Sequence, residues 1–391
     1  MASAAHQLSL SSTSFDRLAD PAGLRAAWDH VRRSADASAS PAIRAEARRF
    51  GEDLDRRLGR LALDLQADRF TFAPALGVAQ ERAGKRPRPI VVAPIESRVV
   101  ARALLDALTA TPAVAALAMS APTSFGGLPG RGVPEAITAA VEAVRGGAAF
   151  HVRSDIADFF RAVPRDRAVA EIAAVIGDAR MARLLDQATR TELANADDLG
   201  ETASLFPGEH LGVAQGNALS TLLGNVVLRG FDAAMNGRGV VCLRYVDDFV
   251  LLGARAAHVS RAFTSAGRLL GELGMCAYDP AADPDKAARG HVASGITWLG
   301  CEIVGGAARP SRASQRALLA RVERSLGEGA RRGALATALA RVEGTVRAYR
   351  ATFGFCACPE VFAALDARVD RMVKRAWSRW GICPRPLARG R

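Results

Sequence analysis

Lysine is nearly absent from this chain, although the chain is strongly basic. Only three of its 52 basic residues are lysines, at positions 85, 286 and 374, and all the others are arginines. Arginine does not readily give up a proton, whereas lysine can. A lysine retained in this background is therefore a candidate for acid–base chemistry, with accidental retention as the alternative.

A zinc-binding pattern, a secretion signal and a membrane span are also missing from the sequence. The six cysteines form no CxxC pair and the six histidines are scattered, which leaves the cysteines as ordinary thiols of a reducing compartment. The N-terminal segment has neither the basic nor the apolar region of a secretion signal. The most apolar window, residues 101–121, contains Arg102 and Asp106 and is broken by Pro112. We therefore expect a cytoplasmic protein that does not associate with a membrane.

Positive charge is concentrated towards the C-terminal end. The 391 residues carry a formal net charge of +12, and residues 309–391 alone hold 18 Lys and Arg against 6 Asp and Glu. A chain of this length is expected to form two or three packed units, so one unit would carry the whole excess. Nucleic acid bound mainly by this segment is the simplest interpretation, and a soluble surface with surplus charge is the alternative.

The pattern of apolar residues predicts helices at both ends of the chain and an antiparallel sheet between them. Residues 1–60 and those after 310 are predicted to be helical, residues 84–94 a basic loop leading into a strand, and residues 95–118 a helix. The middle part predicts a strand at 149–156, helices at 165–177, 179–196 and 218–235, a hairpin at 239–254, a helix at 257–273 and a strand pair at 295–304. This order is typical of a ferredoxin-like α+β sheet, in which the first strand ends beside the turn of the hairpin.

Two adjacent carboxylates occupy the turn of the predicted hairpin RYVDDFVLL. Asp247 and Asp248 would repel each other and lose water to their apolar neighbours unless a cation neutralised them. Mg²⁺ suits such oxygen ligands, because it binds one or two carboxylates together with phosphates and water. The pair Asp197 and Asp198, in NADDLGE, has no flanking strand and is expected to be solvated. An ordinary hairpin turn is the alternative for Asp247 and Asp248.

Asp155, at the end of the first predicted strand, completes a series of motifs. HVRSDIADFF, GVAQGNALSTLLGNVVL, RYVDDFVLL and TWLGCEI resemble, in order and spacing, the motifs of prokaryotic reverse transcriptases of the group II intron and retron type. KRPRPIVVAPIESRVVARAL and TSFGGLPGRGVPEAI are similar to finger-domain motifs of the same family. The resemblance covers roughly residues 80 to 380.

The resemblance implies a right-hand polymerase of the α+β class. A helical extension at 1–60 would precede fingers at 61–148 (to which 165–210 contribute), a palm with the catalytic aspartates at 149–305, and a basic helical thumb at 306–391. The implied activity is RNA-directed DNA polymerisation, in which dNTPs are added to a primer 3′-hydroxyl on an RNA template. The implied partners are the RNA template, a DNA or RNA primer, dNTPs and a cognate noncoding RNA.

A divalent-metal site follows from the same resemblance. Two Mg²⁺ ions, for which Mn²⁺ can substitute, would activate the primer hydroxyl, orient the triphosphate and stabilise the pyrophosphate leaving group. Asp155 and Asp247 are the candidates to bridge both ions, Asp248 would support them, and the carbonyl of Ile156 would add a backbone oxygen. Lys286, in DPDKAARG, corresponds to a lysine that would protonate the departing pyrophosphate.

The resemblance also assigns nucleotide-binding residues. Lys85 and Arg88, in GKRPRP, would fold over the triphosphate, and Gln215 and Gly216 would lie over the incoming nucleotide and the template base. Phe160 would act as a steric gate, since an aromatic ring beneath the sugar clashes with a ribose 2′-hydroxyl. A core phenylalanine is the alternative at this position.

Two features depart from the family pattern, and two other functions compete. The loop reads GVAQGN where group II proteins resemble GVPQGS, and only about 85 residues follow the last predicted strand, which favours a stand-alone, domesticated or defence-associated enzyme. An RNA-dependent RNA polymerase shares the palm, but Phe160 and the YVDD hairpin argue against it. A non-catalytic, maturase-like RNA-binding protein is disfavoured by the complete set of three aspartates.

Overall fold

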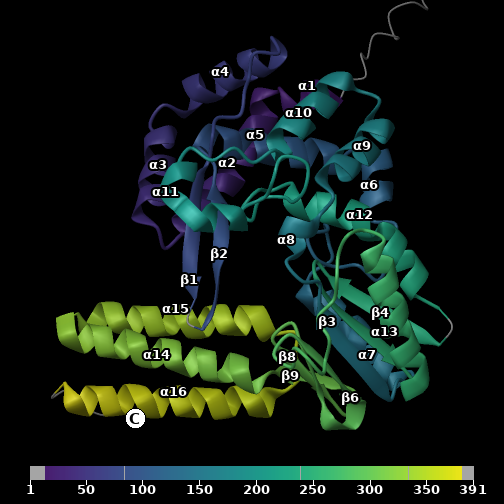
Figure 1. The fold of residues 1–391 in the computed structure, drawn as a ribbon. Coiled ribbons are helices and arrows are strands. Elements are labelled where there is room, and N and C mark those ends of the chain that lie inside the picture. Colours follow the sequence, from purple (N-terminus) through teal and green to yellow (C-terminus); the bar gives the residue numbers. More distant parts are fainter. Residues whose placement is uncertain (1–13, 83, 238, 333, 381–391) are drawn as a thin grey trace, which may run out of the picture.

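The computed structural model describes residues 14–380 apart from residues 83, 238 and 333, and it leaves the side chains of residues 85 and 330–332 undescribed. The chain begins with helices at one end of the molecule (Figure 1). It continues into a mixed region around a four-stranded sheet and ends in a separate bundle of three long helices. A cavity lies beside the four-stranded sheet.

Short amphipathic helices open the described part of the chain. They are α1 (Ser14–Leu18), α2 (Pro21–Asp36), α3 (Pro41–Gly51) and α4 (Leu54–Gln66). Proline occupies the first turn of α2 and of α3, where its missing N–H costs nothing. The buried faces of these helices, including Trp28 and Phe50, join the largest hydrophobic core together with α5 (Ile95–Thr109). The predicted helices are thus confirmed from residue 14 onward, and residues 1–13 lie outside the described residues.

Two local predictions in the next segment are wrong. Residues 85–92 form a strand, β2 (Lys85–Val92), paired with β1 (Leu76–Arg82), although they were predicted to begin as a loop. This ribbon has only two strands, so the prolines of KRPRP interrupt no ladder with a third strand. The predicted helix at 95–118 is two helices, because Pro112 begins a new one, α6 (Pro112–Ala118).

Within the described residues, no single helix has both the length and the apolarity to cross a membrane. The bent pair α5 and α6, which meet at 91°, passes such a test by length and composition only.

The central sheet has the strand order β4-β5-β3-β6 and is antiparallel throughout. Its strands are β3 (Phe150–Asp155), β4 (Val240–Tyr245), β5 (Asp248–Gly253) and β6 (Ala287–His291). This is the order of a ferredoxin-like sheet. Phe249 and Leu251 pack in one core with α12 (Ser220–Met235) and α13 (Ala256–Gly271). Val250 and Leu252, which alternate with them, pack in another with α7 (Val133–Arg145).

The last strand of this sheet was not foreseen. β6 was predicted as part of a loop, because Ala-Ala-Arg-Gly-His lacks an apolar run; as an edge strand it needs none, since half of its residues face outwards. The predicted strand pair at 295–304 exists but belongs to a separate three-stranded sheet. That sheet consists of β7 (Ile296–Trp298), β8 (Cys301–Val304) and β9 (Ala307–Pro310).

The C-terminal part is a bundle of three long helices lying side by side (Figure 1). They are α14 (Arg312–Arg332), α15 (Leu335–Phe353) and α16 (Pro359–Arg379), and they share a core of their own around Val322, Val342 and Val369. The predicted helical, arginine-rich character of this segment is confirmed up to residue 380.

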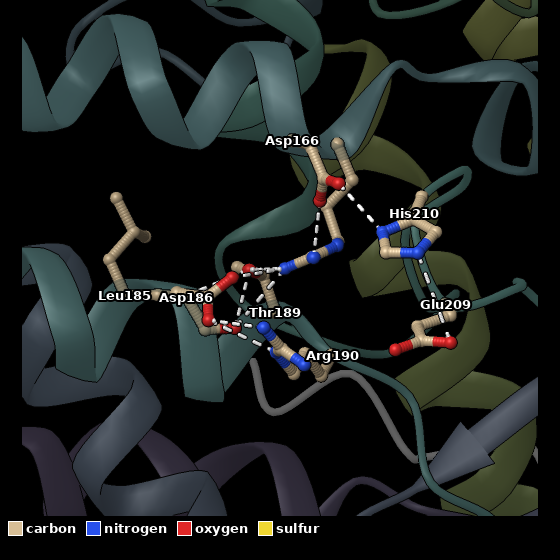
Figure 2. Close-up of polar contacts among 8 residues, drawn as sticks. Asp166, Leu185, Asp186, Thr189, Arg190, Glu209 and His210 are labelled. Carbon is tan, nitrogen blue, oxygen red and sulfur yellow. Dashed lines mark hydrogen bonds and ion pairs between the residues drawn. The ribbon is translucent and has the colours of Figure 1, made fainter.

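A buried arginine joins two of the α-helices that lie between β3 and α12. The α-helices of this segment are α8 (Phe159–Ala162), α9 (Arg165–Ile176), α10 (Ala179–Thr189) and α11 (Ala196–Leu199). Arg165, whose side chain is 2% exposed, donates from Nη1 to Asp186 Oδ1 over 2.8 Å and also pairs with Asp166. Figure 2 shows Asp166, Asp186, Arg190 and His210 within this network. α10 ends at Thr189, where Arg190 turns to an extended conformation, earlier than the predicted residue 196.

Candidate active site

Strand pairing brings together two of the three aspartates singled out in the sequence. Asp155, the last residue of β3, lies directly opposite Asp248, the first residue of β5. Asp247 occupies the turn between β4 and β5, and its carbonyl accepts a hydrogen bond of 2.9 Å from the Ile156 amide. Residues paired across an antiparallel ladder point their side chains to the same face. The three carboxyl groups are therefore neighbours because of the sheet topology.

This grouping of carboxylates is electrostatically unfavourable. Burial, together with the charge of Asp155, raises the pKa of Asp248 to about 7. The same two causes raise the pKa of Asp247. Cations offset only part of the cost: Lys286 Nζ lies 2.8 Å from Asp155 Oδ2, and Arg153 Nη1 lies 3.9 Å from both Asp155 Oδ1 and Asp248 Oδ2.

Lys286 reaches the aspartates from the loop before β6. Its hydrogen bond to Asp155 is the main cause that raises the pKa of the Lys286 ammonium, which is therefore fully protonated at neutral pH. The ammonium also lies 5.4 Å from the centre of the Tyr278 ring. The structure thus places the second of the three lysines at the carboxylates.

Two contacts at this site were not foreseen in the sequence. Trp298, which is 1% exposed, donates from its indole Nε1 to Asp248 Oδ1 over 3.0 Å. Arg153 lies two residues before Asp155 on the same face of β3. The motifs TWLGCEI and HVRSDI contained both residues, but only the tertiary fold shows which groups they contact.

A cavity of about 680 Å³ opens in front of Asp155 and Asp247. Its lining includes the following residues named from the sequence: Arg88, Asp155, Ile156, Phe160, Gln215, Asp247 and Lys286. Asp248 does not line this cavity. Gly216 lines a different cavity, of about 490 Å³. Lys85 begins β2, but its side chain lies outside the described part of the structure.

Two consecutive phenylalanines at α8 have different environments. Phe159 is 3% exposed and fills the core, where its ring lies against Gly224. Phe160 is half-buried, and its carbonyl accepts a hydrogen bond of 2.6 Å from the Val213 amide. Of the two rings, only that of Phe160 is partly exposed where it lines the cavity in front of Asp155 and Asp247.

The hairpin of β1 and β2 is locked to the loop LGVAQGN. Arg88 Nε donates to Gln215 Oε1 over 2.6 Å, and the Val91 amide donates to the Gln215 carbonyl over 2.9 Å. Gly216 has φ of 114°, and a Cβ atom there would lie 2.6 Å from the Val91 carbonyl oxygen. Only glycine allows this close approach, so the loop needs Gly216 for its backbone.

The donor set suits a hard divalent cation. All three side chains offer carboxylate oxygens, and burial and the charge of Asp155 raise the pKa values of Asp247 and Asp248, an effect that a bound cation would oppose. The Lys286 ammonium on Asp155 acts as a monovalent stand-in. Among the described residues, no group of three or more His, Cys, Asp or Glu side chains is placed so that it could hold a metal ion by itself. A hard divalent cation does not need three protein ligands, because it can take one or two carboxylates and complete its shell with phosphate and water.

Comparison with known proteins agrees with this geometry. The family described as "Reverse transcriptase (RNA-dependent DNA polymerase)" matches residues 80–303, which is more than half of the chain. None of the proteins with curated functions matches. Solved structures that are similar include a partial Cas6-RT-Cas1–Cas2 complex, with 21% identity and a TM-score of 0.40 over 67% of this chain and 42% of that chain. Telomerase from Candida albicans, in complex with a fragment of telomeric RNA, gives 12% identity and a TM-score of 0.43 over 82% of this chain and 60% of that one.

The sheet is ferredoxin-like, and its first strand and central hairpin place aspartates next to a cavity. Together with the family match, this arrangement defines a polymerase of the right-hand fold. The chain belongs to the reverse transcriptase family, which comprises RNA-directed DNA polymerases that use divalent metal ions. It spans less than two thirds of the length of each of the two solved chains.

Proposed function

We propose that this chain adds dNTPs to the 3′-hydroxyl of a DNA or RNA primer on an RNA template, using two Mg²⁺ ions, for which Mn²⁺ can substitute. The observation that supports it most is the pairing of Asp155 with Asp248 across the sheet, with Asp247 in the adjoining turn. A cavity in front of them is also lined by Arg88, Phe160, Gln215 and Lys286, the groups that such a reaction needs around the nucleotide.

In this proposal the residues divide the work by their chemistry. Asp155 and Asp247 would hold the metal ions, with Asp248 and the Ile156 carbonyl in support. When bound, the ions lower the pKa of the primer hydroxyl and neutralise charge on the phosphates. Arg88 binds triphosphate oxygens with its fork of donors, and its hydrogen bond to Gln215 fixes its direction. The hairpin that carries Arg88 thereby closes one side of the cavity.

We further assign the parts of the molecule to the divisions of a right-hand polymerase. Residues 1–60 are a helical extension, 61–148 with 165–210 the fingers, 149–305 the palm and 306–391 the thumb. The independent core of α14, α15 and α16 supports a separate thumb, and the ribbon β1–β2 supports the fingers. The proposed boundary at residue 306 separates β9 from β8, with which it pairs.

The biological setting is part of the same proposal. We place the enzyme in the cytoplasm, working with a cognate noncoding RNA in phage defence. The 12 surplus positive charges of residues 309–391 support an RNA partner, because phosphate contacts supply most of the affinity for nucleic acids.

Phe160 provides the test of the DNA-polymerase assignment. Wild-type protein should extend a primer on an RNA template with dNTPs and discriminate strongly against rNTPs. Phe160→Ala should accept rNTPs far more readily, because the ring that clashes with the 2′-hydroxyl is gone. The measurement is the incorporation efficiency of matched dNTP and rNTP in each protein.

Phe159→Leu is the matched control for this change. It alters the neighbouring ring, which borders the same cavity but is buried in the core, so it should lower thermal stability without relaxing the choice of sugar. If folded Phe160→Ala keeps the wild-type ratio, Phe160 is not the gate.

The thumb assignment predicts a change in salt dependence. Arg341 and Arg347 are exposed on α15, where Arg341 pairs with the half-buried Glu328 and Arg347 pairs with the exposed Glu343. The double change Arg341→Gln/Arg347→Gln should weaken binding to template–primer of any sequence. It should also flatten the plot of log affinity against log salt by about one unit for each phosphate that the protein no longer neutralises. Binding measured across a salt series gives both values.

Arg25→Gln/Arg56→Gln removes the same charge from exposed positions of the N-terminal helices, and it should leave the salt slope unchanged. An equal slope for the α15 variant and wild type would show that Arg341 and Arg347 only face solvent.

A further inference from the structure

A fully buried ion pair lies directly behind the aspartate turn. Arg244 is 1% exposed and Asp232, on α12, is 3% exposed. Arg244 precedes Asp247 by three residues, yet it does not line the cavity. A buried ion pair often contributes little to stability, because the desolvation of two charges offsets their attraction. Its presence here therefore calls for a reason other than stability.

Every donor of the Arg244 guanidinium has a partner. Nε and Nη2 bind the two carboxylate oxygens of Asp232 over 2.7 and 2.6 Å. Nη2 also donates to Ser124 Oγ over 2.7 Å, and Nη1 donates to Asn225 Oδ1 over 3.0 Å. The remaining donor of Nη1 reaches the carbonyl of Val246 over 2.8 Å. The guanidinium thus connects α12 and residue 124 to the turn that carries Asp247.

The residue held by this last bond is in an unfavourable conformation. Val246 has φ of 60°, in the left-handed region, where a β-branched residue is a genuine outlier. Such a backbone persists only where its surroundings impose it, and imposed conformations cluster at functional sites. Val246 immediately precedes Asp247, so its φ and ψ set the direction in which the Asp247 carboxylate leaves the turn.

The motif TSFGG (residues 123–127) also contacts the backbone of Arg244 and of the turn at Val246. The Arg244 amide donates to the Thr123 carbonyl and the Phe125 amide donates to the Arg244 carbonyl, each over 2.9 Å. Gly126 then lies against the turn so closely that a Cβ atom there would be 2.6 Å from the Val246 amide nitrogen. Asn225 Nδ2 holds Gly126 in place through its carbonyl, over 3.0 Å.

We infer that Arg244, paired with Asp232, is a positioning residue that holds the left-handed Val246 peptide and thereby aims Asp247 at the bound cations. The inference rests on the proposed function, because it assumes that Asp247 is a metal ligand. Arg244 itself touches neither substrate nor metal. Its contribution is the single hydrogen bond to Val246, which an apolar replacement of the ion pair cannot make.

The paired variant Arg244→Met/Asp232→Leu separates positioning from stability. It replaces both charges with apolar groups of similar size, so it leaves no unpaired buried charge. It does remove the donors to Ser124, Asn225 and the Val246 carbonyl, so it should stay folded and melt moderately below the wild-type temperature. Its Mn²⁺ affinity, read from the electron paramagnetic resonance signal of free Mn²⁺, should fall about 10–100-fold, the usual cost of losing a group that orients a metal ligand. The single-turnover extension rate should fall similarly, and half-saturation should shift to higher Mg²⁺.

Two further variants make the result specific. Adding Val246→Gly to the paired variant should recover part of the Mn²⁺ affinity, because glycine adopts positive φ without being held. Arg165→Met removes another buried guanidinium, which joins α9 to α10; it should lower the melting temperature and leave the Mn²⁺ affinity unchanged.

The outcomes are distinct. A folded paired variant with wild-type Mn²⁺ affinity and rate overturns the inference while leaving the proposed function intact. If wild-type protein neither binds Mn²⁺ nor extends a primer, the proposed function itself fails. Should the paired variant not fold, Arg244→Lys decides: its single ammonium can face Asp232 but cannot also serve Val246, Asn225 and Ser124. A folded Arg244→Lys protein with wild-type Mn²⁺ affinity would equally overturn the inference.

Discussion

Asp247→Asn should abolish RNA-templated primer extension, with a loss of at least about 10²–10³-fold, the scale seen when one main electrostatic stabiliser is removed. The amide keeps the size of the carboxyl but loses the charge that a divalent cation needs. Because burial and Asp155 already raise the pKa of Asp247, the neutral amide should not destabilise the fold. Template–primer affinity should stay near the wild-type value, since the three-helix bundle is unchanged. Single-turnover extension and a binding titration measure the two effects.

The second aspartate pair of the chain supplies the control for this experiment. Asp197 and Asp198 are exposed on α11, away from the sheet, so Asp197→Asn should extend primers at the wild-type rate. The sequence predicted them in a loop, and the short helix does not alter their exposure. Robust Mg²⁺-dependent synthesis by the Asp247→Asn protein would contradict the metal-site proposal.

The centre of the fold was predictable because its signals are local and repeat along the chain. RYVDDFVLL has apolar runs on both sides of two carboxylates, which is sufficient to predict β4, the turn and β5. Chain order then required β3 to lie beside β5, which brought Asp155 to Asp248. β6 escaped prediction because an edge strand of alanine, arginine, glycine and histidine carries no such pattern.

The supporting residues of the site could not be predicted, because their partners are distant in the sequence. Trp298 contacts Asp248 from 50 positions away, and Arg244 contacts Ser124 from 120 positions away. Nothing local distinguishes Arg244 from the many other arginines of this chain until the fold buries it beside Asp232. The family motifs did identify Lys286 and Gln215, and both residues line the cavity in front of Asp155 and Asp247. Gly216, which the same motifs identified, lines a different cavity.

Lys286→Arg should slow the chemical step by about 10²–10⁴-fold, the usual contribution of general acid catalysis. The bond between the α-phosphate and the leaving pyrophosphate breaks with a build-up of negative charge, which a proton donor relieves. Lys286 begins the reaction protonated, because the ordinary pKa of a lysine ammonium lies well above neutral pH. Arginine would keep the positive charge opposite Asp155, but it is a far poorer proton donor, because its pKa lies well above that of lysine. Single-turnover extension at saturating dNTP isolates this step, and nucleotide affinity should barely change.

Lys286→Leu and Lys374→Arg complete the series and decide what Lys286 contributes. The leucine variant loses both charge and proton, so it should be at least as slow as the arginine variant, whereas Lys374, exposed on α16, should tolerate arginine without loss. If Lys286→Arg runs at the wild-type rate while Lys286→Leu is slow, the residue supplies only the charge that now faces Asp155 over 2.8 Å. If both variants run at the full rate, Lys286 takes no part in the reaction and its retention in an arginine-rich chain is accidental.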